Sequence, residues 1–370
     1  MSTGALALFL DLARLVTPSG RERAAAEHCR AYLEALGLEV EEDGAGPQIG
    51  GDTGNLHVRI PATAPGTAIF LCSHLDTVPV DTHVEPVVED GMVRNAAGSI
   101  LGADNKASVA GMLDGIRRIV ESGELHAGIE LVLTPQEEVG LRGAKAVDPA
   151  RLVSRCGFVY DHTGPIGGVI TRAPTQKTLT LRFQGRAAHA GIEPESGASA
   201  ILAAARAIAE MPQGRLDAGT TANVGLVHGG SARNVVAASC TVEAEARSLD
   251  HVRAGEVAQA MVDAATAAAA LTGCSLEADV REEYRAYALP LSSPPGRIVR
   301  AALSAIGRTP SELSTGGGAD SHIFNAAGIP CVNVCSGMMD VHTPDEWIRA
   351  ADVDLLSDLT VAIVRAARDA

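Results

Sequence analysis

The chain of 370 residues carries a formal net charge of −15, and its sequence pI is about 5.2. A protein this acidic repels nucleic-acid phosphates, and aromatic residues make up only 3% of the chain, so we expect no nucleic-acid partner. A hydrophobic content of 46% with 20% charged residues is typical of a folded globular protein, and the length predicts two domains.

The N-terminal residues and the cysteines predict a cytoplasmic protein. Asp11 and Arg14 interrupt the apolar residues 5–16, and no basic segment precedes them, so this stretch predicts an amphipathic helix rather than a signal peptide. No uncharged run approaches the roughly 20 residues that a membrane span needs. The seven cysteines are an odd number without a C-x-x-C pair, which argues against a disulfide framework and a structural zinc finger.

The first half of the chain alternates helical and strand-like patterns. In chain order these are two helices, two strands, a helix and a third strand, at about residues 5–16, 22–36, 56–60, 68–73, 105–121 and 129–134. This order predicts an α/β fold whose sheet is largely parallel or mixed and is covered by helices.

A different order begins after residue 174. Residues 178–183 alternate apolar and polar side chains, as in a half-buried strand, and the pattern continues as β-α-β-β-α-β. A Pro/Ser-rich segment follows, and the helix–strand alternation then resumes. We therefore predict a discontinuous larger domain of residues 1–174 and 288–370, with a two-layer α+β domain of residues 175–287 inserted in it.

Side chains suited to metal binding follow several predicted strands. His74 and Asp76 come after the apolar run 69–72, at the carboxyl end of a strand, where open α/β sheets place their sites. Residues i and i+2 of an extended chain share a face, so Asp76 can accept the imidazole N–H of His74 and leave the other ring nitrogen for a metal. A turn histidine with a capping aspartate fits the same tripeptide.

Further acidic residues and a second histidine follow the other strands. Asp104 lies where a glycine-containing loop enters a helix, so it fits both an N-cap and a carboxylate shared by two metals. Glu137 and Glu138 follow the third strand, and two adjacent carboxylates are costly in a cleft unless cations offset them. Asp161 and His342 each follow a further apolar run. Taken singly, each of these residues also fits a turn or a solvated surface.

Taken together, these residues form the ligand set of a metal site. Two histidines and three carboxylates suit borderline divalent cations, above all Zn²⁺, and Co²⁺ and Mn²⁺ share these ligands. If Asp104 bridges two ions, each ion receives three protein ligands and keeps the open position of a catalytic site. Glu137 is then free to act as general base.

Six motifs occur along the chain in the order SHLDTV, LGADNKASVAG, TPQEEVGLRGAK, RAAHAGIEPESG, GGSARNVV and VHTPDEWI. They resemble the peptidase T branch of the two-zinc exopeptidase and deacylase family, which also includes carboxypeptidase G-type enzymes, acetylornithine deacetylase and succinyl-diaminopimelate desuccinylase. The resemblance covers essentially the whole chain. It implies a zinc-exopeptidase-like catalytic domain, with a mixed sheet and helices on both faces, and an inserted α+β ferredoxin-like lid or dimerisation domain.

The resemblance also implies roles for the residues of the larger domain. One zinc ion would be held by His74, Asp104 and Asp161, and the other by Asp104, Glu138 and His342. Asp76 would orient His74, and Glu137 would act as the base. Position 105 is Asn where many relatives carry a second Asp, and no ligand role is expected of it.

Further residues match positions at which relatives contact the substrate. His189 would stabilise the oxyanion of the transition state as the lid closes, in several relatives from the partner subunit. Asn234 and Arg247 match substrate-binding positions, and Arg247 is suited to a bidentate grip on a substrate carboxylate. Gly316 and Gly317 belong to a glycine loop that would line the substrate pocket through backbone groups.

The expected function is metal-dependent hydrolysis of amide bonds in small peptides, by a peptidase T-like aminopeptidase acting on di- or tripeptides. The first alternative is a deacylase of N-acyl amino acids that uses the same centre. The second is a non-catalytic binding protein on this fold. The inserted domain is the candidate contact of a homodimer.

Overall fold

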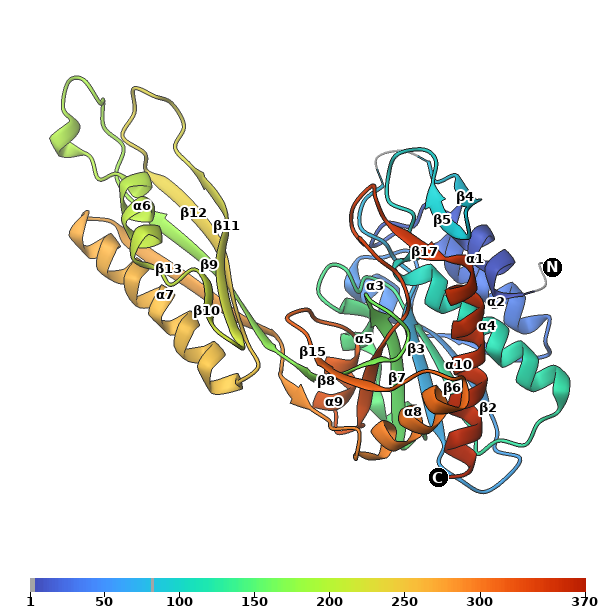
Figure 1. Cartoon of the computed structure of the whole chain (residues 1–370). Coiled ribbons are helices and arrows are strands. Elements are labelled where there is room, and N and C mark those ends of the chain that lie inside the picture. The colour runs from blue at the N-terminus through green and yellow to red at the C-terminus, as the bar shows by residue number, and fades with distance from the viewer. Residues whose placement is uncertain (1–3, 81–82) are drawn as a thin grey trace. The chain divides into compact units, whose positions relative to one another are not determined.

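A computed structural model describes residues 4–80 and 83–370 and shows two compact units (Figure 1). The main unit comprises Met1–Arg172, Ala288–Ser314 and Ala319–Ala370, and the inserted unit comprises Ala173–Tyr287 and Thr315–Gly318. Residues 315–318 were expected in the larger domain. They belong to the inserted unit because the backbone oxygen of Gly316 accepts a hydrogen bond from Arg247, and Gly318 packs against the ring of Tyr284.

The main sheet has the order β1–β2–β6–β3–β7–β16–β8–β14, with β15 beside β8. These strands are β1 Val40–Glu42, β2 Leu56–Ile60, β3 Ile69–His74, β6 Ile129–Thr134, β7 Cys156–His162, β8 Gly168–Ala173, β14 Tyr287–Ala288, β15 Ser311–Ser314 and β16 Cys331–Cys335. Strands β6, β3, β7 and β16 are mutually parallel, whereas β2 runs antiparallel to β6. Every residue of β3 and β6 is buried, as expected for central strands covered on both faces.

Helices cover both faces of this sheet. Ile69 and Leu71 of β3 belong to a core shared with five helices, namely α1 Ala5–Ala13, α2 Arg23–Glu34, α4 Ala103–Ser122, α8 Pro294–Ala305 and α10 Ala350–Arg368. Phe70 and Cys72 point to the opposite face and pack with Phe324 of α9 Ser321–Ala326. The predicted mixed sheet with helices on both faces is therefore confirmed. Shorter helices of this unit are α3 Ala45–Ile49, α5 Arg142–Ala146 and the 3₁₀ turn Pro149–Arg151.

Two local contacts stabilise the main unit. Helices α4 and α10 approach closely at Gly111, where an added Cβ would lie 2.4 Å from the Cβ of Leu356. Helix α2 is tied to β1 by a bidentate ion pair in which both terminal nitrogens of Arg23 lie 2.8 Å from the carboxylate oxygens of Glu42. This pairing lowers the pKa of Glu42 to about 2.

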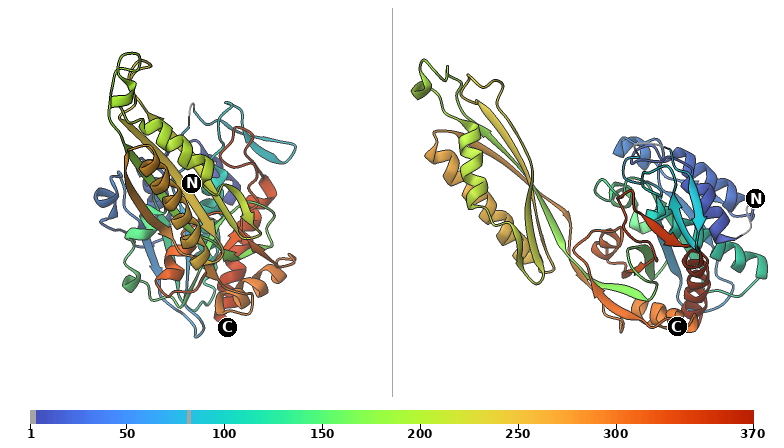
Figure 2. Two further views of the ribbon diagram at one scale, coloured as in Figure 1. Left: turned by 90° about the vertical axis from the view of Figure 1, so that its left-hand side faces the viewer. Right: turned by 45° about the horizontal axis from the view of Figure 1, so that its top comes forward.

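The inserted unit is a two-layer α+β structure. Its sheet has the order β10–β11–β12–β9–β13, with bounds β9 Thr175–Gln184, β10 Gly214–Asp217, β11 Thr220–Gly229, β12 Ser239–Ser248 and β13 Ser275–Tyr284. Helices α6 Ala200–Glu210 and α7 His251–Leu271 cover one face (Figures 1 and 2). The predicted β-α-β-β-α-β order is confirmed, with the short edge strand β10 in addition. A 3₁₀ turn, Pro194–Ser196, lies between β9 and α6.

The main unit also has a small second sheet, which includes a strand from the segment that follows β16. Strands β17 Trp347–Arg349, β5 Met92–Asn95 and β4 Pro86–Glu89 pair in that order. The guanidinium of Arg94 lies over the ring of Trp347, 5.7 Å from the ring centroid, and adds a cation–π contact to the β17–β5 pairing. No helix in the described ranges combines the length and the apolar character that a bilayer crossing requires.

Candidate metal centre

The structure brings the predicted ligands of the main unit together at one edge of its sheet. His74 ends β3, Glu138 follows β6, Asp161 lies at the end of β7 and His342 follows β16. Because these strands are parallel, their carboxyl ends meet at the same edge. Asp104 reaches this edge from the first turn of α4.

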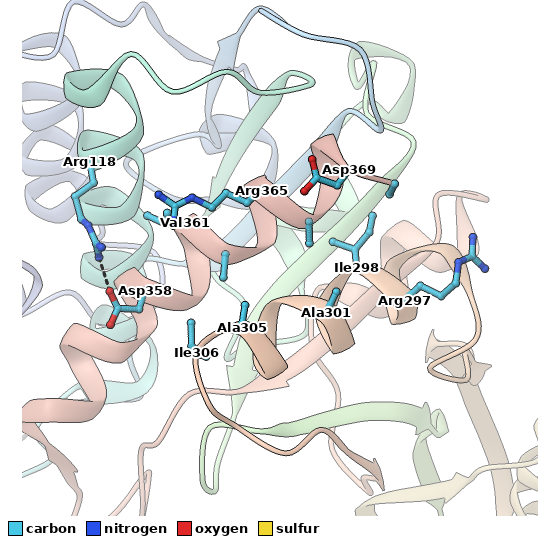
Figure 3. A pocket seen from close by; sticks show the side chains of 13 residues that line it. Arg118, Arg297, Ile298, Ala301, Ala305, Ile306, Asp358, Val361, Arg365 and Asp369 are labelled. Carbon is cyan, nitrogen blue, oxygen red and sulfur yellow. Dashed lines mark hydrogen bonds and ion pairs between the residues drawn. The ribbon is translucent and has the colours of Figure 1, made fainter.

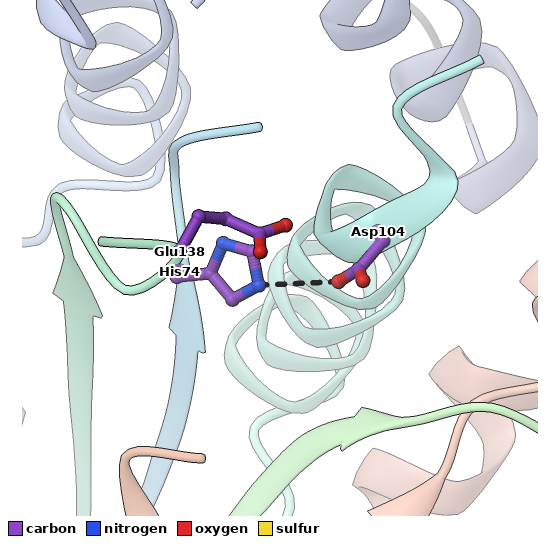
Figure 4. Close-up of side chains that lie close together, drawn as sticks. All are labelled: His74, Asp104 and Glu138. Atoms are coloured by element: carbon purple, nitrogen blue, oxygen red, sulfur yellow. Dashed lines mark hydrogen bonds and ion pairs between the residues drawn. The ribbon is translucent and has the colours of Figure 1, made fainter. Parts of the chain in front are cut away.

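Asp104 faces both histidines, with one carboxylate oxygen toward each. Its Oδ1 lies 3.1 Å from Nε2 of His74, and its Oδ2 lies 3.2 Å from Nε2 of His342. Asp161 completes the first group, with its Oδ1 3.5 Å from Nε2 of His74. Glu138 completes the second group, with its Oε1 3.0 Å from Nε2 of His342. Figure 4 shows the His74, Asp104 and Glu138 side chains converging from three different elements.

Glu137 lies within the same cluster. Two groups of three residues each place one potential ligand atom per residue within 4.8 Å of one another. The groups are His74, Glu137 and Asp161, and His74, Asp104 and Glu138. Glu137 is only 9% exposed, so its carboxylate is not a solvated surface group. The adjacent glutamates therefore both reach the cluster rather than pointing to opposite faces.

Asp76 has two tasks in this geometry, and only the first was expected. Nδ1 of His74 lies 3.0 Å from the backbone oxygen of Asp76 and 3.4 Å from its Oδ1, so Nδ1 carries the ring proton and Nε2 is left for the cluster. The Asp76 carboxylate also accepts the backbone N–H groups of Glu137 and Glu138, at 2.9 and 3.1 Å, and the hydroxyl of Ser19, at 2.7 Å. One buried carboxylate thus positions a histidine and both glutamates.

The backbone before the glutamates leaves the strand conformation. Gln136 has a φ of 56°, in the left-handed region that non-glycine residues rarely adopt. The carboxylate of Glu22 accepts the N–H of Gln136 at 3.1 Å and that of Gly20 at 2.7 Å. Residues in such backbone conformations persist where their surroundings hold them, and they gather at functional sites. His342 is another, with a φ of 64°.

Three residues that support the cluster were missed in the sequence, namely Ser19, Glu22 and Glu346. The first two lie in the stretch TPSGRE, whose glycine and flanking polar residues indicate a structured turn. Glu346 follows His342 by four residues, and its carboxylate accepts backbone N–H groups at the start of α4. Its position in the acidic motif HTPDEW was the available signal.

The charges in the cluster are not balanced by the protein alone. Burial raises the pKa of Glu137 well above its ordinary value and that of Asp161 to about 7. Burial acts in the same direction on Asp104, but hydrogen bonds from His342 and His74 outweigh it and hold its pKa far below the ordinary value. Hydrogen bonds to Asp104 and Glu138 raise the pKa of His342 to about 10. Buried carboxylates thus outnumber the two imidazoles, a donor set that fits divalent cations.

His189 and Asn234 lie in neighbouring loops of the inserted unit. The backbone N–H of Ala190 donates to the backbone oxygen of Asn234 at 3.0 Å, and His189 pairs with Val235 in a β-bridge. Both side chains are exposed. The sequence alone did not show that these two motifs, RAAHAG and GGSARNVV, are paired through their backbones.

Arg247 has its guanidinium engaged within the inserted unit. Nε and Nη2 lie 3.0 and 2.9 Å from the two carboxylate oxygens of Glu245, a bidentate pair. Nη1 donates to the backbone oxygen of Gly316 at 3.0 Å and to the hydroxyl of Tyr284 at 3.3 Å. The fork expected to grip a substrate carboxylate therefore holds Glu245 in this structure. Gly317 donates its N–H to Thr315 Oγ1 at 3.0 Å.

A groove of about 630 Å³ lies elsewhere on the main unit, between α4, α8 and α10 (Figure 3). Ile298 and Val361 are among its apolar lining residues, and at its rim Arg118 pairs with Asp358 at 2.8 Å. Among the described residues that line it, none is a predicted site residue.

Comparisons with known proteins agree with this architecture. Residues 175–272 match the peptidase dimerisation domain, and residues 55–167 match peptidase family M28. The chain is 36% identical to the uncharacterized protein YqjE of Bacillus subtilis (strain 168), over 97% of both chains. It is 25% identical to a peptidase T of Vibrio cholerae, over 90% of this chain and 92% of the relative.

Two solved structures are similar over nearly the whole chain. The aminopeptidase PepT from Bacillus cereus is 35% identical, with a TM-score of 0.88, covering 97% of this chain and 96% of the other. A tripeptidase from Staphylococcus aureus is 33% identical, with a TM-score of 0.93, covering 99% of this chain and 98% of the other. The fold, the ligand cluster and these matches define a metallopeptidase with an inserted dimerisation domain. Within that class, the chain belongs to the M20 family as a peptidase T-like member.

Proposed function

We propose that this protein is an aminopeptidase that hydrolyses amide bonds in small peptides, di- or tripeptides, with two divalent metal ions, Zn²⁺ in the first instance. The observation that carries the proposal is the Asp104 carboxylate, which directs one oxygen to each of two groups of ligands. The names of the relatives support the substrate class, since they include an aminopeptidase and a tripeptidase.

The two ion positions follow from the two groups of ligands. The first would be held by His74, Asp104 and Asp161, and the second by Asp104, Glu138 and His342. When bound, the ions supply Lewis acidity that polarises the scissile carbonyl group and lowers the pKa of a water molecule. Co²⁺ or Mn²⁺ could replace Zn²⁺, because these ligands suit all three ions.

Glu137 is the proposed general base. Its carboxylate reaches the cluster from the backbone that Asp76 holds, beside the ligands but outside the two proposed sets. It would take a proton from the attacking water onto a carboxylate oxygen and deliver this proton to the leaving amine. His189 would then donate a hydrogen bond to the oxyanion of the tetrahedral transition state.

The inserted unit would supply substrate contacts and the dimer interface. Asn234 and Arg247 would bind the substrate, as would the backbone of Gly316 and Gly317. The match to the peptidase dimerisation domain supports a homodimer through this unit. The seven cysteines are free thiols, which supports a reducing, cytoplasmic location.

The test compares two neighbouring glutamates by metal analysis and turnover. Glu137→Ala should retain two ions per chain and lose turnover by several orders of magnitude, because only the proton acceptor is removed. Glu138→Ala should lose one ion. Glu137→Ala with near wild-type turnover would contradict the assignment of the base, and a chelated wild-type protein that keeps its activity would contradict the metal mechanism.

A substrate panel tests the reaction itself. Di- and tripeptides with a free α-amine should be cleaved, whereas N-acetyl and N-succinyl amino acids should be poor substrates. The reverse preference would identify a deacylase. No turnover of either class by the metal-loaded protein would indicate a binding protein.

A further inference from the structure

Glu346 is a buried carboxylate outside the proposed ligand set. It is 1% exposed and accepts three backbone N–H groups, from Leu101 and Gly102 at 2.8 Å each and from Asp104 at 2.9 Å. The first two bonds reach Oε2 and the third reaches Oε1, so both carboxylate oxygens are used. A carboxylate that receives three N–H groups holds the peptide segment in one geometry.

This contact lies where the chain enters helix α4. The N-cap residue is Gly102, which has no side chain and adopts a φ of 74°, and Asp104 has a non-helical ψ of 102°. The N–H groups of Leu101 and Gly102 precede the helix, and that of Asp104 lies in its irregular first turn. Glu346 supplies the acceptor for all three from a distant part of the chain.

The contact also fixes the backbone that carries Asp104. Asp104 leaves the helical conformation, with a φ of −79° and a ψ of 102°, and directs its two carboxylate oxygens to His74 and His342. Because Glu346 accepts the N–H of Asp104, it holds the backbone from which this carboxylate extends.

Glu346 also belongs to the loop that carries His342. The backbones of Met339 and Trp347 pair at the base of this loop, with N···O distances of 2.9 and 3.1 Å. Trp347 Nε1 donates to Asp340 Oδ2 at 3.0 Å. His342 is held in this closed loop with its positive φ, and Glu346 lies at the closure. The one carboxylate thus joins the segment of Asp104 to the segment of His342.

We propose that Glu346 is a positioning residue that sets the distance between Asp104 and His342 and thereby the affinity of the second metal position. The inference rests on the proposed two-metal centre. It assigns to Glu346 no contact with substrate or metal. Its effect passes entirely through the backbone of residues 101–104 and the loop 339–347.

The test measures metal affinity rather than turnover alone. Metal-free wild type, Glu346→Gln and Glu346→Ala are titrated with Zn²⁺ in competition with a chelator, and their thermal unfolding is followed. Gln keeps one acceptor oxygen but places an NH₂ group against an N–H donor, and Ala removes both acceptors. We expect both variants to weaken binding at the second position by roughly 10- to 100-fold, Ala more than Gln, and to weaken binding at the first position, which shares only Asp104 with the second, by a smaller factor.

Glu130→Gln is the matched control. Glu130 is also 1% exposed and accepts backbone N–H groups, from Val153 at 3.0 Å and Ser154 at 2.8 Å, but it lies at the start of β6, away from the ligand edge. This variant should lose thermal stability and keep both metal affinities. Excess Zn²⁺ should restore kcat in Glu346→Gln, whereas it should not restore kcat in Glu137→Ala.

The outcomes separate this inference from the proposed function. A wild type that binds two ions and cleaves peptides, with Glu346 variants of equal metal affinity, would overturn the role of Glu346 alone. A wild type that binds fewer than two ions would overturn the two-metal centre itself. If Glu346→Ala fails to fold, the nearly isosteric Glu346→Gln still decides the question.

Discussion

Replacing Asp76 with Asn tests whether one buried carboxylate holds the backbone of Glu137 and Glu138 in place. The Asp76 side chain is fully buried, and its Oδ1 accepts the N–H of Glu137 while its Oδ2 accepts the N–H of Glu138 and the hydroxyl of Ser19. Asparagine keeps the shape of the side chain. It replaces one oxygen with an NH₂ group, which cannot accept a hydrogen bond.

The magnitude follows from the two backbone donors. Whichever way the Asn amide turns, its NH₂ group faces the N–H of either Glu137 or Glu138, so one buried N–H loses its acceptor. Leaving a buried donor unsatisfied costs about 1–3 kcal/mol, and we expect the free energy of unfolding of the metal-free protein to fall by that amount. Displacing Glu137, the proposed base, by about 1 Å is sufficient to lower turnover on the order of 100-fold.

The assay pairs urea unfolding with kcat/KM for a tripeptide. Asp114→Asn is the control, because Asp114 is also buried and accepts hydrogen bonds from Arg117 of α4 and Ser357 of α10, at 2.8 and 2.6 Å, and bonds neither glutamate. Both variants should lose stability, but only Asp76→Asn should lose kcat/KM. If the two variants keep kcat/KM values within about twofold of each other, Asp76 does not position the proposed base.

Three further predictions concern packing, pH and the inserted unit. Gly111→Ala should lower the melting temperature by forcing α4 from α10, at a cost of about 1–3 kcal/mol, whereas Gly255→Ala in α7, where an added Cβ meets nothing within 4 Å, should raise it. The pKa of Glu42 is lowered to about 2 in the folded state, so its stabilising contribution is present above pH 4.5 and is lost as the pH falls toward 2. The free energy of unfolding of Glu42→Gln should therefore fall less between pH 5 and pH 3 than that of wild type. An equal fall in both proteins would disprove this linkage. Glu245→Gln should free Arg247 and lower KM for peptides with a free C-terminal carboxylate relative to their C-terminal amides, and an equal KM change for both series would contradict a carboxylate-binding role of Arg247.

Much of the cluster could be predicted because its chemistry follows the ends of parallel strands. A run of apolar residues that ends in His74 or leads to Glu138 is a local pattern, and parallel strands bring such ends to one edge. The fold class could be predicted for the same reason, since the alternation of elements along the chain determines the layers.

The supporting contacts could not be predicted because they join distant segments. The bond from the Asp104 N–H to Glu346 spans 242 residues, and no periodicity connects the two positions. The sequence therefore left Asp104 open between a cap and a ligand. The pairing of Arg247 with Glu245 could have been anticipated, because residues i and i+2 of a strand share a face.

The position of strand β16 in the sheet affects the order in which the protein can fold during its synthesis. It lies between β7 and β8 in the sheet, although both of those strands, and the whole Ala173–Tyr287 segment, precede it in the chain. Until residues 331–335 leave the ribosome, the nascent chain therefore lacks the strand that joins β7 to β8 in its largest sheet. His342 and Glu346 are synthesised later still, so the proposed second metal position cannot form before this segment is made. Its assembly therefore depends on the same late segment that completes the sheet.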